Sequence, residues 1–149
     1  MKSLAKVAFI FLCVLPCFGQ IVYVHHSGSD PIGQRIAFAL KNSVIGSHGY
    51  RLVDSVDTAG MMIDLSTIDP LGEISIGQLS LKNSSAAVSV VVTINVGTSC
   101  RSTTFVVIYH RIYIIGSSNA EAFGKALLAE IDERLSELRS AAEKDGVKP

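Results

Sequence analysis

The residues whose types could carry chemistry begin with two adjacent histidines, His25 and His26, which are followed by Ser27. Imidazole titrates near neutral pH, so either histidine could act as a base for the serine hydroxyl or as a metal ligand. Residues 21–25 are predicted to form a strand, however, and neighbouring side chains of a strand point to opposite faces. The two histidines therefore cannot easily bind one ion, and we predict no catalytic residue here.

The other candidate ligands lie far apart in the sequence. His110 interrupts an apolar strand pattern, which is typical of a core or edge histidine, and His48 lies in a turn containing glycine. The acidic residues Asp64, Asp69 and Glu73 could supply oxygen ligands, but their spacing matches no calcium loop. The sequence also contains no nucleophile elbow, phosphate loop or dinucleotide-binding motif. We therefore predict no metal and no cofactor.

A stripe of aromatic residues points to a binding surface. Phe105, Tyr109 and Tyr113 are predicted to share one face of a strand, with Arg111 between the tyrosines. Exposed aromatic side chains beside an arginine are typical anchors of protein interfaces. The alternative is that these aromatic residues are core and that the other face of the strand, which runs from Val106 to Ile114, is exposed.

The first 19 residues have the layout of a secretory signal peptide. Lys2 and Lys6 precede an apolar run over residues 7–15, and small or turn-forming residues follow up to Gly19. The apolar run is shorter than the ~20 residues that span a bilayer. Pro16 disfavours lipid modification of Cys17. We predict cleavage before Gln20, a mature protein that does not span the membrane, and a periplasmic or secreted location.

Composition limits the mature chain to one small domain. Two of the 13 Lys and Arg and none of the 13 Asp and Glu lie in residues 1–19, so the remainder carries 11 basic and 13 acidic residues. This formal charge of −2 argues against a nucleic-acid partner. We predict a single domain over residues 20–142 and a flexible tail over residues 143–149. Only Cys100 remains after cleavage, so no disulfide can form within one chain.

The hydrophobic periodicity predicts an α+β fold. Patterns of period two indicate strands, and apolar residues at three- and four-residue steps indicate helices. The predicted strands cover residues 21–25, 50–53, 61–68, 88–96 and 105–115, with an irregular hairpin arm between residues 71 and 85. The predicted helices cover residues 31–45 and about 118–142. We expect a two-layer sandwich in the order β-α-β-β-β-β-α, with two helices on one face of a mostly antiparallel sheet of four to five strands.

This order of elements resembles a group of small bacterial envelope domains. These are the amino-terminal domain of the Tol translocation protein B and the lipopolysaccharide-assembly lipoprotein. The resemblance includes the turn at Asp30-Pro31, the strand over residues 50–53, the loop at Ala59 and the final helix, and it extends to about Leu138. It implies an envelope protein that binds another protein or an amphiphile and catalyses nothing.

Together, these observations favour an exported, non-catalytic binding or assembly module. Its expected partner is a second copy of the chain or another envelope protein, and the last hairpin is the expected contact. The alternative is a small periplasmic hydrolase or ligand-binding protein with a site near His25, His26 and Ser27.

Overall fold

The computed structural model describes residues 20–71, 75–76, 79–80, 84–95 and 105–144. The predicted signal peptide over residues 1–19 and residues 145–149 of the predicted tail therefore lie outside the described residues. The same holds for Glu73 and Cys100.

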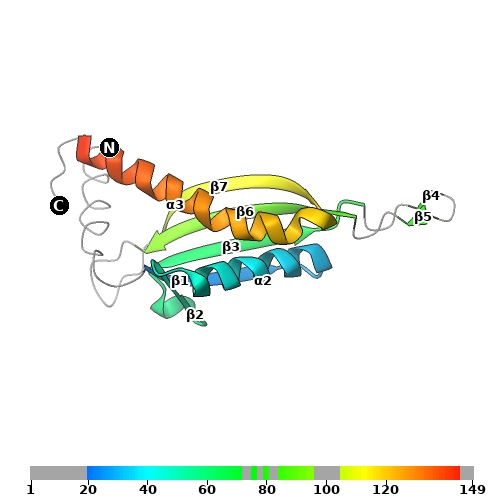
Figure 1. Cartoon of the computed structure of the whole chain (residues 1–149), viewed down its shortest axis with the longest axis horizontal. Coiled ribbons are helices and arrows are strands. Elements are labelled where there is room, and N and C mark those ends of the chain that lie inside the picture. Colours follow the sequence, from blue (N-terminus) through cyan, green and yellow to red (C-terminus); the bar gives the residue numbers. More distant parts are fainter. Residues whose placement is uncertain (1–19, 72–74, 77–78, 81–83, 96–104, 145–149) are drawn as a thin grey trace.

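The order of elements agrees with the prediction, and the fold is α+β (Figure 1). Three strands and one helix form the first half: β1 (Gln20–Ser27), α2 (Pro31–Gly46), β2 (Tyr50–Val53) and β3 (Met61–Ile68), with the 3-10 turn η1 (Val56–Thr58) before β3. A small hairpin follows, made of β4 (Ser75–Ile76) and β5 (Leu79–Ser80). The second half contains β6 (Ser85–Asn95), β7 (Phe105–Gly116), the 3-10 turn η2 (Ser117–Asn119) and α3 (Ala120–Lys144).

The main sheet is mixed, with the strand order β2-β1-β3-β6-β7. Strand β1 runs parallel to both of its neighbours, β2 and β3, whereas β6 runs antiparallel to β3 and to β7. The expectation of a mostly antiparallel sheet therefore holds only for β3, β6 and β7. The helix α2 provides the crossover that lets β1 and β2 run parallel.

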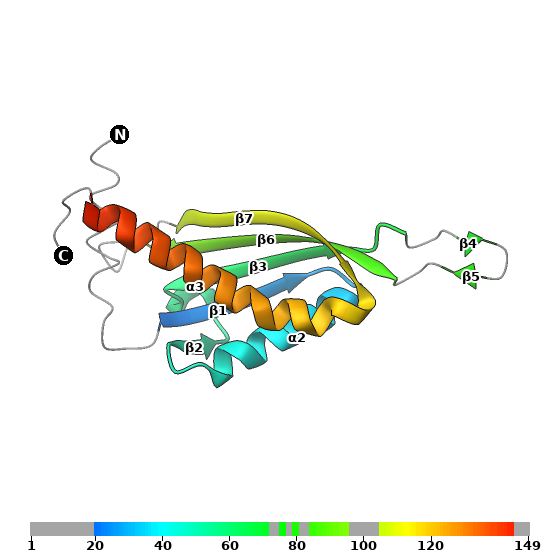
Figure 2. The ribbon, with the colours of Figure 1, turned by 45° about the horizontal axis from the view of Figure 1, so that its top comes forward.

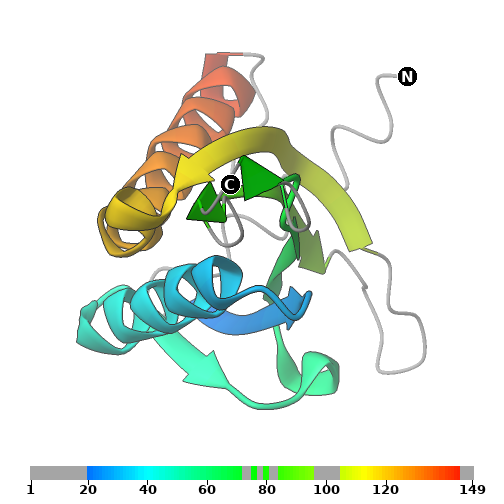
Figure 3. The same ribbon diagram turned by 90° about the vertical axis from the view of Figure 1, so that its right-hand side faces the viewer.

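Both helices pack on the same face of the sheet, as predicted (Figure 3). Alternate residues of the central strands face this layer, and their apolar side chains are buried between sheet and helices. The strands contribute Val22, Val24, Met61, Ile63, Leu65, Val88, Val90 and Val92 to the core, and the helices contribute Ile32, Ile36, Leu40, Val44, Leu127, Ile131 and Leu135. The opposite side, which we call the open face, carries no helix of the described chain.

A polar junction fixes the start of α2. Asp30 caps the helix, since its Oδ1 accepts a hydrogen bond from the Gly33 backbone N–H at 2.6 Å. Its other carboxylate oxygen accepts a hydrogen bond from the Thr67 hydroxyl at the end of β3. His26 Nε2 lies 2.8 Å from the same hydroxyl oxygen. We call these residues the Asp30 junction.

The junction leaves no room for a side chain at Gly33. A Cβ atom there would lie 2.1 Å from Thr67 Oγ1 and 2.6 Å from His26 Nε2. Gly28 has a φ of 132°, a conformation that favours glycine, and lets the chain turn from β1 towards α2 beside Thr67.

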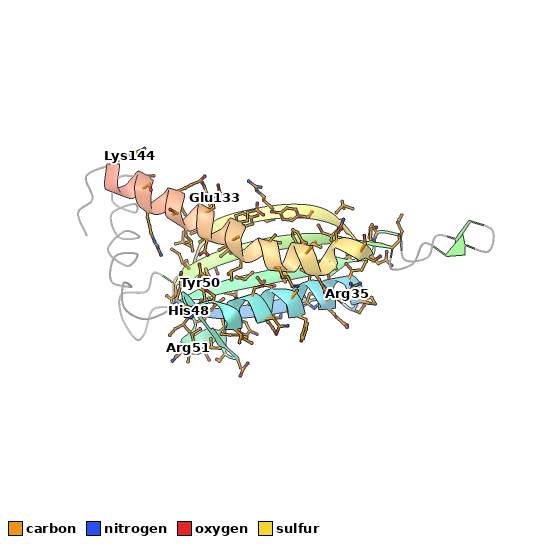
Figure 4. All side chains as sticks on the ribbon, viewed as in Figure 1. Arg35, His48, Tyr50, Arg51, Glu133 and Lys144 are labelled. Atoms are coloured by element: carbon orange, nitrogen blue, oxygen red, sulfur yellow. The ribbon has the colours of Figure 1, made fainter. Side chains whose placement is uncertain are left out.

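At each end of α2, polar contacts connect α2, or the strand that follows it, with η2 and α3 (Figure 4). Near the beginning of α2, Arg35 donates to the Ser117 carbonyl oxygen at 3.0 Å and lies 3.6 Å from a Glu121 carboxylate oxygen. Beyond its end, the Tyr50 hydroxyl donates to the Asp132 carboxylate on α3. Burial and this carboxylate raise the pKa of Tyr50, so its hydroxyl stays protonated and can donate.

A β-bulge in the last hairpin reverses part of the predicted face assignment. Val92 pairs with Tyr109, whereas the next residue, Thr93, pairs with Val107, so Ile108 is one residue too many on β7. As a result, Val106 lies on the same side as Tyr109, on the helix side. The prediction had placed these two residues on opposite faces and was wrong at this point.

The two helices approach closely at Gly124, and this contact can be tested. A Cβ atom at Gly124 would lie 2.6 Å from the Ile36 carbonyl oxygen and 2.8 Å from Ala39 Cβ. Gly124→Ala should push α3 away from α2 and lower the free energy of unfolding by about 1–3 kcal/mol, despite the better helix propensity of alanine. Urea denaturation measures this effect. The control, Lys125→Ala, changes a neighbouring exposed side chain and should have little effect. Equal stabilities would contradict the close contact.

Candidate functional site

One group of polar residues on the open face lies near the end of β1. His25 Nδ1 lies 2.9 Å from an Asp64 carboxylate oxygen on β3. One step further along the strands, Ser27 Oγ and Ser66 Oγ are 2.9 Å apart. The register places each pair directly opposite across β1 and β3, which explains why these side chains meet.

His26 points to the other side of the sheet, as the strand prediction required. It belongs to the Asp30 junction, where the Thr67 hydroxyl proton is donated to Asp30, so His26 Nε2–H must be the donor to Thr67. Burial lowers the pKa of His26, an effect that Asp30 opposes and that the nearby His25 and Lys41 reinforce.

The hydrolase hypothesis requires a histidine bonded to Ser27, and the described residues do not show this bond. Ser27 instead bonds to Ser66, while His25 bonds to Asp64. A hollow of about 520 Å³ lies beside β1 where β2 ends, and both histidines line it together with Phe38, Lys41 and other residues, but Ser27 does not. A base and its orienting carboxylate are therefore present without a serine bonded to the base.

The tyrosines of the predicted aromatic stripe lie under α3 and not on an exposed surface. Tyr109 is only 7% exposed, and Tyr113 packs against Phe123 of α3 with ring centroids 4.8 Å apart. Of the two alternatives for the stripe, exposure is therefore wrong for the tyrosines, because the helix layer covers their side of β7. Phe105 is half-buried and pairs with Asn95, on the open side of the sheet, so the bulge separates it from the tyrosines.

Tyr109, Arg111 and Tyr113 do come together, around an acidic residue that the sequence analysis missed. The Tyr109 hydroxyl bonds to the Tyr113 hydroxyl, which donates to Glu130 with oxygen distances of 3.0 Å. Arg111 Nη1 lies 2.8 Å from Glu130 Oε1, and the guanidinium carbon lies 5.6 Å from the centre of the Tyr109 ring. Burial and the hydrogen bonds to Tyr113 and Glu130 raise the pKa of Tyr109, so its hydroxyl remains protonated.

A charged hollow of about 500 Å³ opens beside these residues, between β7 and α3. It is lined by residues of both charge signs, namely Arg111, Arg134, Glu130, Glu133 and Glu137, together with Ile108, Tyr109 and His110. Arg134 pairs with Glu137 at 2.9 Å, in addition to the Arg111–Glu130 pair. For Glu133, the described residues offer no ion pair.

The exposed apolar side chains of the open face form the second candidate surface. Ile112 and Ile114 are 69% and 68% exposed, and Ile68 of β3 is 67% exposed. The register places Ile68, Ala87 and Ile114 in one row across three strands, with Ile112 next to it. We call these four residues the open patch. Its signal in the sequence was the apolar face of residues 106–114, which the sequence analysis kept as the alternative.

No metal site is found among the described residues, since no three His, Cys, Asp or Glu side chains gather there. Asp64 is bonded to His25, and Asp69 Oδ1 accepts a hydrogen bond from the Leu71 N–H at 3.0 Å.

Within the described ranges, no helix has the length and apolar character needed to cross a membrane. In comparisons with known proteins, no family model and no curated protein matches the chain.

The half-buried His26 gives a testable pH dependence. Because the pKa of His26 is lower in the folded protein than in the unfolded chain, the unfolded state binds more protons below pH ~6.5. The stability that neutral His26 contributes should therefore be fully present above this pH and be lost as the pH falls below it. His26→Gln keeps an N–H donor for Thr67 and should flatten this slope in urea titrations. The control, His48→Gln, removes an exposed histidine outside the Asp30 junction and should leave the slope in place. Equal slopes for His26→Gln and wild type would contradict the assignment.

Proposed function

We propose that the protein is an exported, non-catalytic binding or assembly module of the bacterial envelope that acts through protein–protein contacts at the hairpin of β6 and β7. The observation that carries the proposal is the exposure of large apolar side chains along β7, on the face without helices. Val107, Ile112 and Ile114 are each more than half exposed. Clustered apolar surface of this kind marks protein interaction sites, whereas single exposed apolar residues are ordinary.

The arrangement of polar groups supports binding over catalysis. The carboxylate-bonded histidine, His25, is exposed, and its neighbour Ser27 is bonded to another serine. Nucleophilic catalysis needs the base within hydrogen-bond reach of the nucleophile. The resemblance to envelope domains points the same way, and it stays a prediction, as does the periplasmic or secreted location.

Export is tested by the mass of the native protein's amino terminus. The basic residues Lys2 and Lys6, the apolar run over residues 7–15 and Gly19 should direct cleavage, so the mature chain should begin at Gln20. Intact-mass and amino-terminal peptide analysis measure this. Retention of residues 1–19 in the mature protein would contradict the export signal.

Association through the open patch is tested by a double substitution with a matched control. Ile112→Ser with Ile114→Ser removes the most exposed apolar side chains of β7 and should lower the assembly state measured by sedimentation and native crosslinking. These side chains are exposed in the monomer, so the fold should lose little stability. The control, Phe38→Ser with Ile45→Ser, removes side chains that are 68% and 66% exposed on α2 and should leave the assembly unchanged.

An unchanged assembly state in the β7 double variant would contradict the proposal. Loss of assembly in the α2 control alone would place the interface on the helix layer instead. Circular dichroism of all variants shows whether each has kept its fold.

A further inference from the structure

Strand β7 leaves one edge of the sheet unpaired. It is the last strand in the order β2-β1-β3-β6-β7, and it pairs only with β6 among the described strands (Figure 2). Its 12 residues contain neither proline nor lysine, which commonly protect exposed edges from pairing. The sheet's other edge strand, β2, has only four residues.

The hydrogen bonding shows which backbone groups of β7 point outward. Just beyond the strand, Ser117 N–H donates to the Ser84 carbonyl oxygen at 3.0 Å and so continues the ladder with β6. In an antiparallel pair, alternate residues bond to the neighbouring strand and those between them point away. The outward N–H and C=O groups therefore belong to His110, Ile112 and Ile114, whose side chains lie on the open face.

The bulge limits the regular part of this edge to residues 109–115, between Ile108 and Gly116. An antiparallel pairing of this stretch with its own copy is symmetric about Ile112. In this register Ile112 lies opposite Ile112 of the second copy, and His110 lies opposite Ile114. The open patches of the two copies would then join side by side.

The charged side chains beside this edge have both signs, so the surface can pair with a second copy of itself. The charged hollow lies between β7 and α3, so a two-fold axis at Ile112 would bring the hollows of two copies next to each other. Glu133 of α3 (Figure 4) is exposed and has no ion pair among the described residues. It is therefore available to pair with a basic residue of the other copy's hollow, such as Arg111. Residues of both signs in one hollow suit a two-fold contact, in which the same surface meets itself.

We infer that the partner of the hairpin is a second copy of this chain, which adds its β7 antiparallel to β7 and extends the sheet across a two-fold axis near Ile112. This inference rests on the proposed association through the hairpin and names its partner and geometry. Main-chain hydrogen bonds along β7 provide the contact, and the isoleucines of the open patch and the charged hollow fix the register.

The first experiment blocks only the outward hydrogen bonds. His110→Pro removes an outward N–H and places a ring at the edge, while the ladder to β6 keeps its bonds, because proline is tolerated at such edge positions. Sedimentation of the full chain should show dimer dissociation at a concentration about tenfold or more above that of the control. The control, His110→Ala, removes the same imidazole, keeps the N–H and should dimerise as the wild type does.

The second experiment tests the register and does not depend on the proline variant folding. Directly opposite residues of a hydrogen-bonded antiparallel pair have Cα atoms ~5.5 Å apart, within the range that a disulfide spans. Ile112→Cys, with Cys100 and any retained Cys13 and Cys17 replaced by serine, should therefore form a crosslinked dimer on mild oxidation. Ile45→Cys in the same background, on α2, should not.

The two proposals fail in different ways. If His110→Pro folds and still dimerises, or if Ile112→Cys gives no more crosslinked dimer than Ile45→Cys, edge pairing is wrong. Loss of assembly in the Ile112→Ser and Ile114→Ser double variant would then still support the hairpin as a binding surface through its open face. If that double variant also assembles normally, both proposals are wrong.

Discussion

The Asp30 junction joins α2, β3 and, through His26, β1, and the position of the start of α2 depends on it. The Asp30 carboxylate accepts hydrogen bonds from the Gly33 N–H and from the Thr67 hydroxyl. These bonds hold the start of α2 and the end of β3 together beside the end of β1. Loss of one partner would leave a buried polar group unpaired, which costs about 1–3 kcal/mol. The junction holds the start of α2 on the side of the sheet where the apolar side chains of the strands and helices meet, and the other side stays open.

Local patterns were sufficient to predict the elements. Asp30-Pro31 predicts the start of α2. The Asp30 side chain can cap the helix, and proline is tolerated at the first helical position because the N–H there has no partner within the helix. The alternation over residues 88–94 gave the buried face of β6 correctly, because every second residue is a valine or isoleucine. What these patterns could not give is the parallel pairing of β1 with both β2 and β3, since partner choice depends on contacts between distant segments.

The candidate site was predicted less well, for a related reason. Both faces of residues 105–115 are apolar, so the pattern does not say which one meets the helices. A single extra residue at Ile108 then moves the side chains before it to the opposite faces. The spacing of Tyr109 and Tyr113 correctly predicted that they lie together, but their partner, Glu130, comes from another element. Only the packing of α3 against β7 brings that carboxylate to the tyrosine hydroxyls.

The two edges of the sheet differ in a way that bears on function. A short edge strand such as β2 offers few free backbone groups, whereas β7 offers a long row of them beside exposed isoleucines. The bulge at Ile108 disturbs one end of this row and leaves the stretch over residues 109–115 regular. Unprotected edges invite pairing with many strands, so a specific contact needs a second element of recognition. The hollow containing Arg111 and Glu133 lies beside this same stretch, and its charges favour a partner that presents the opposite charges in the matching register.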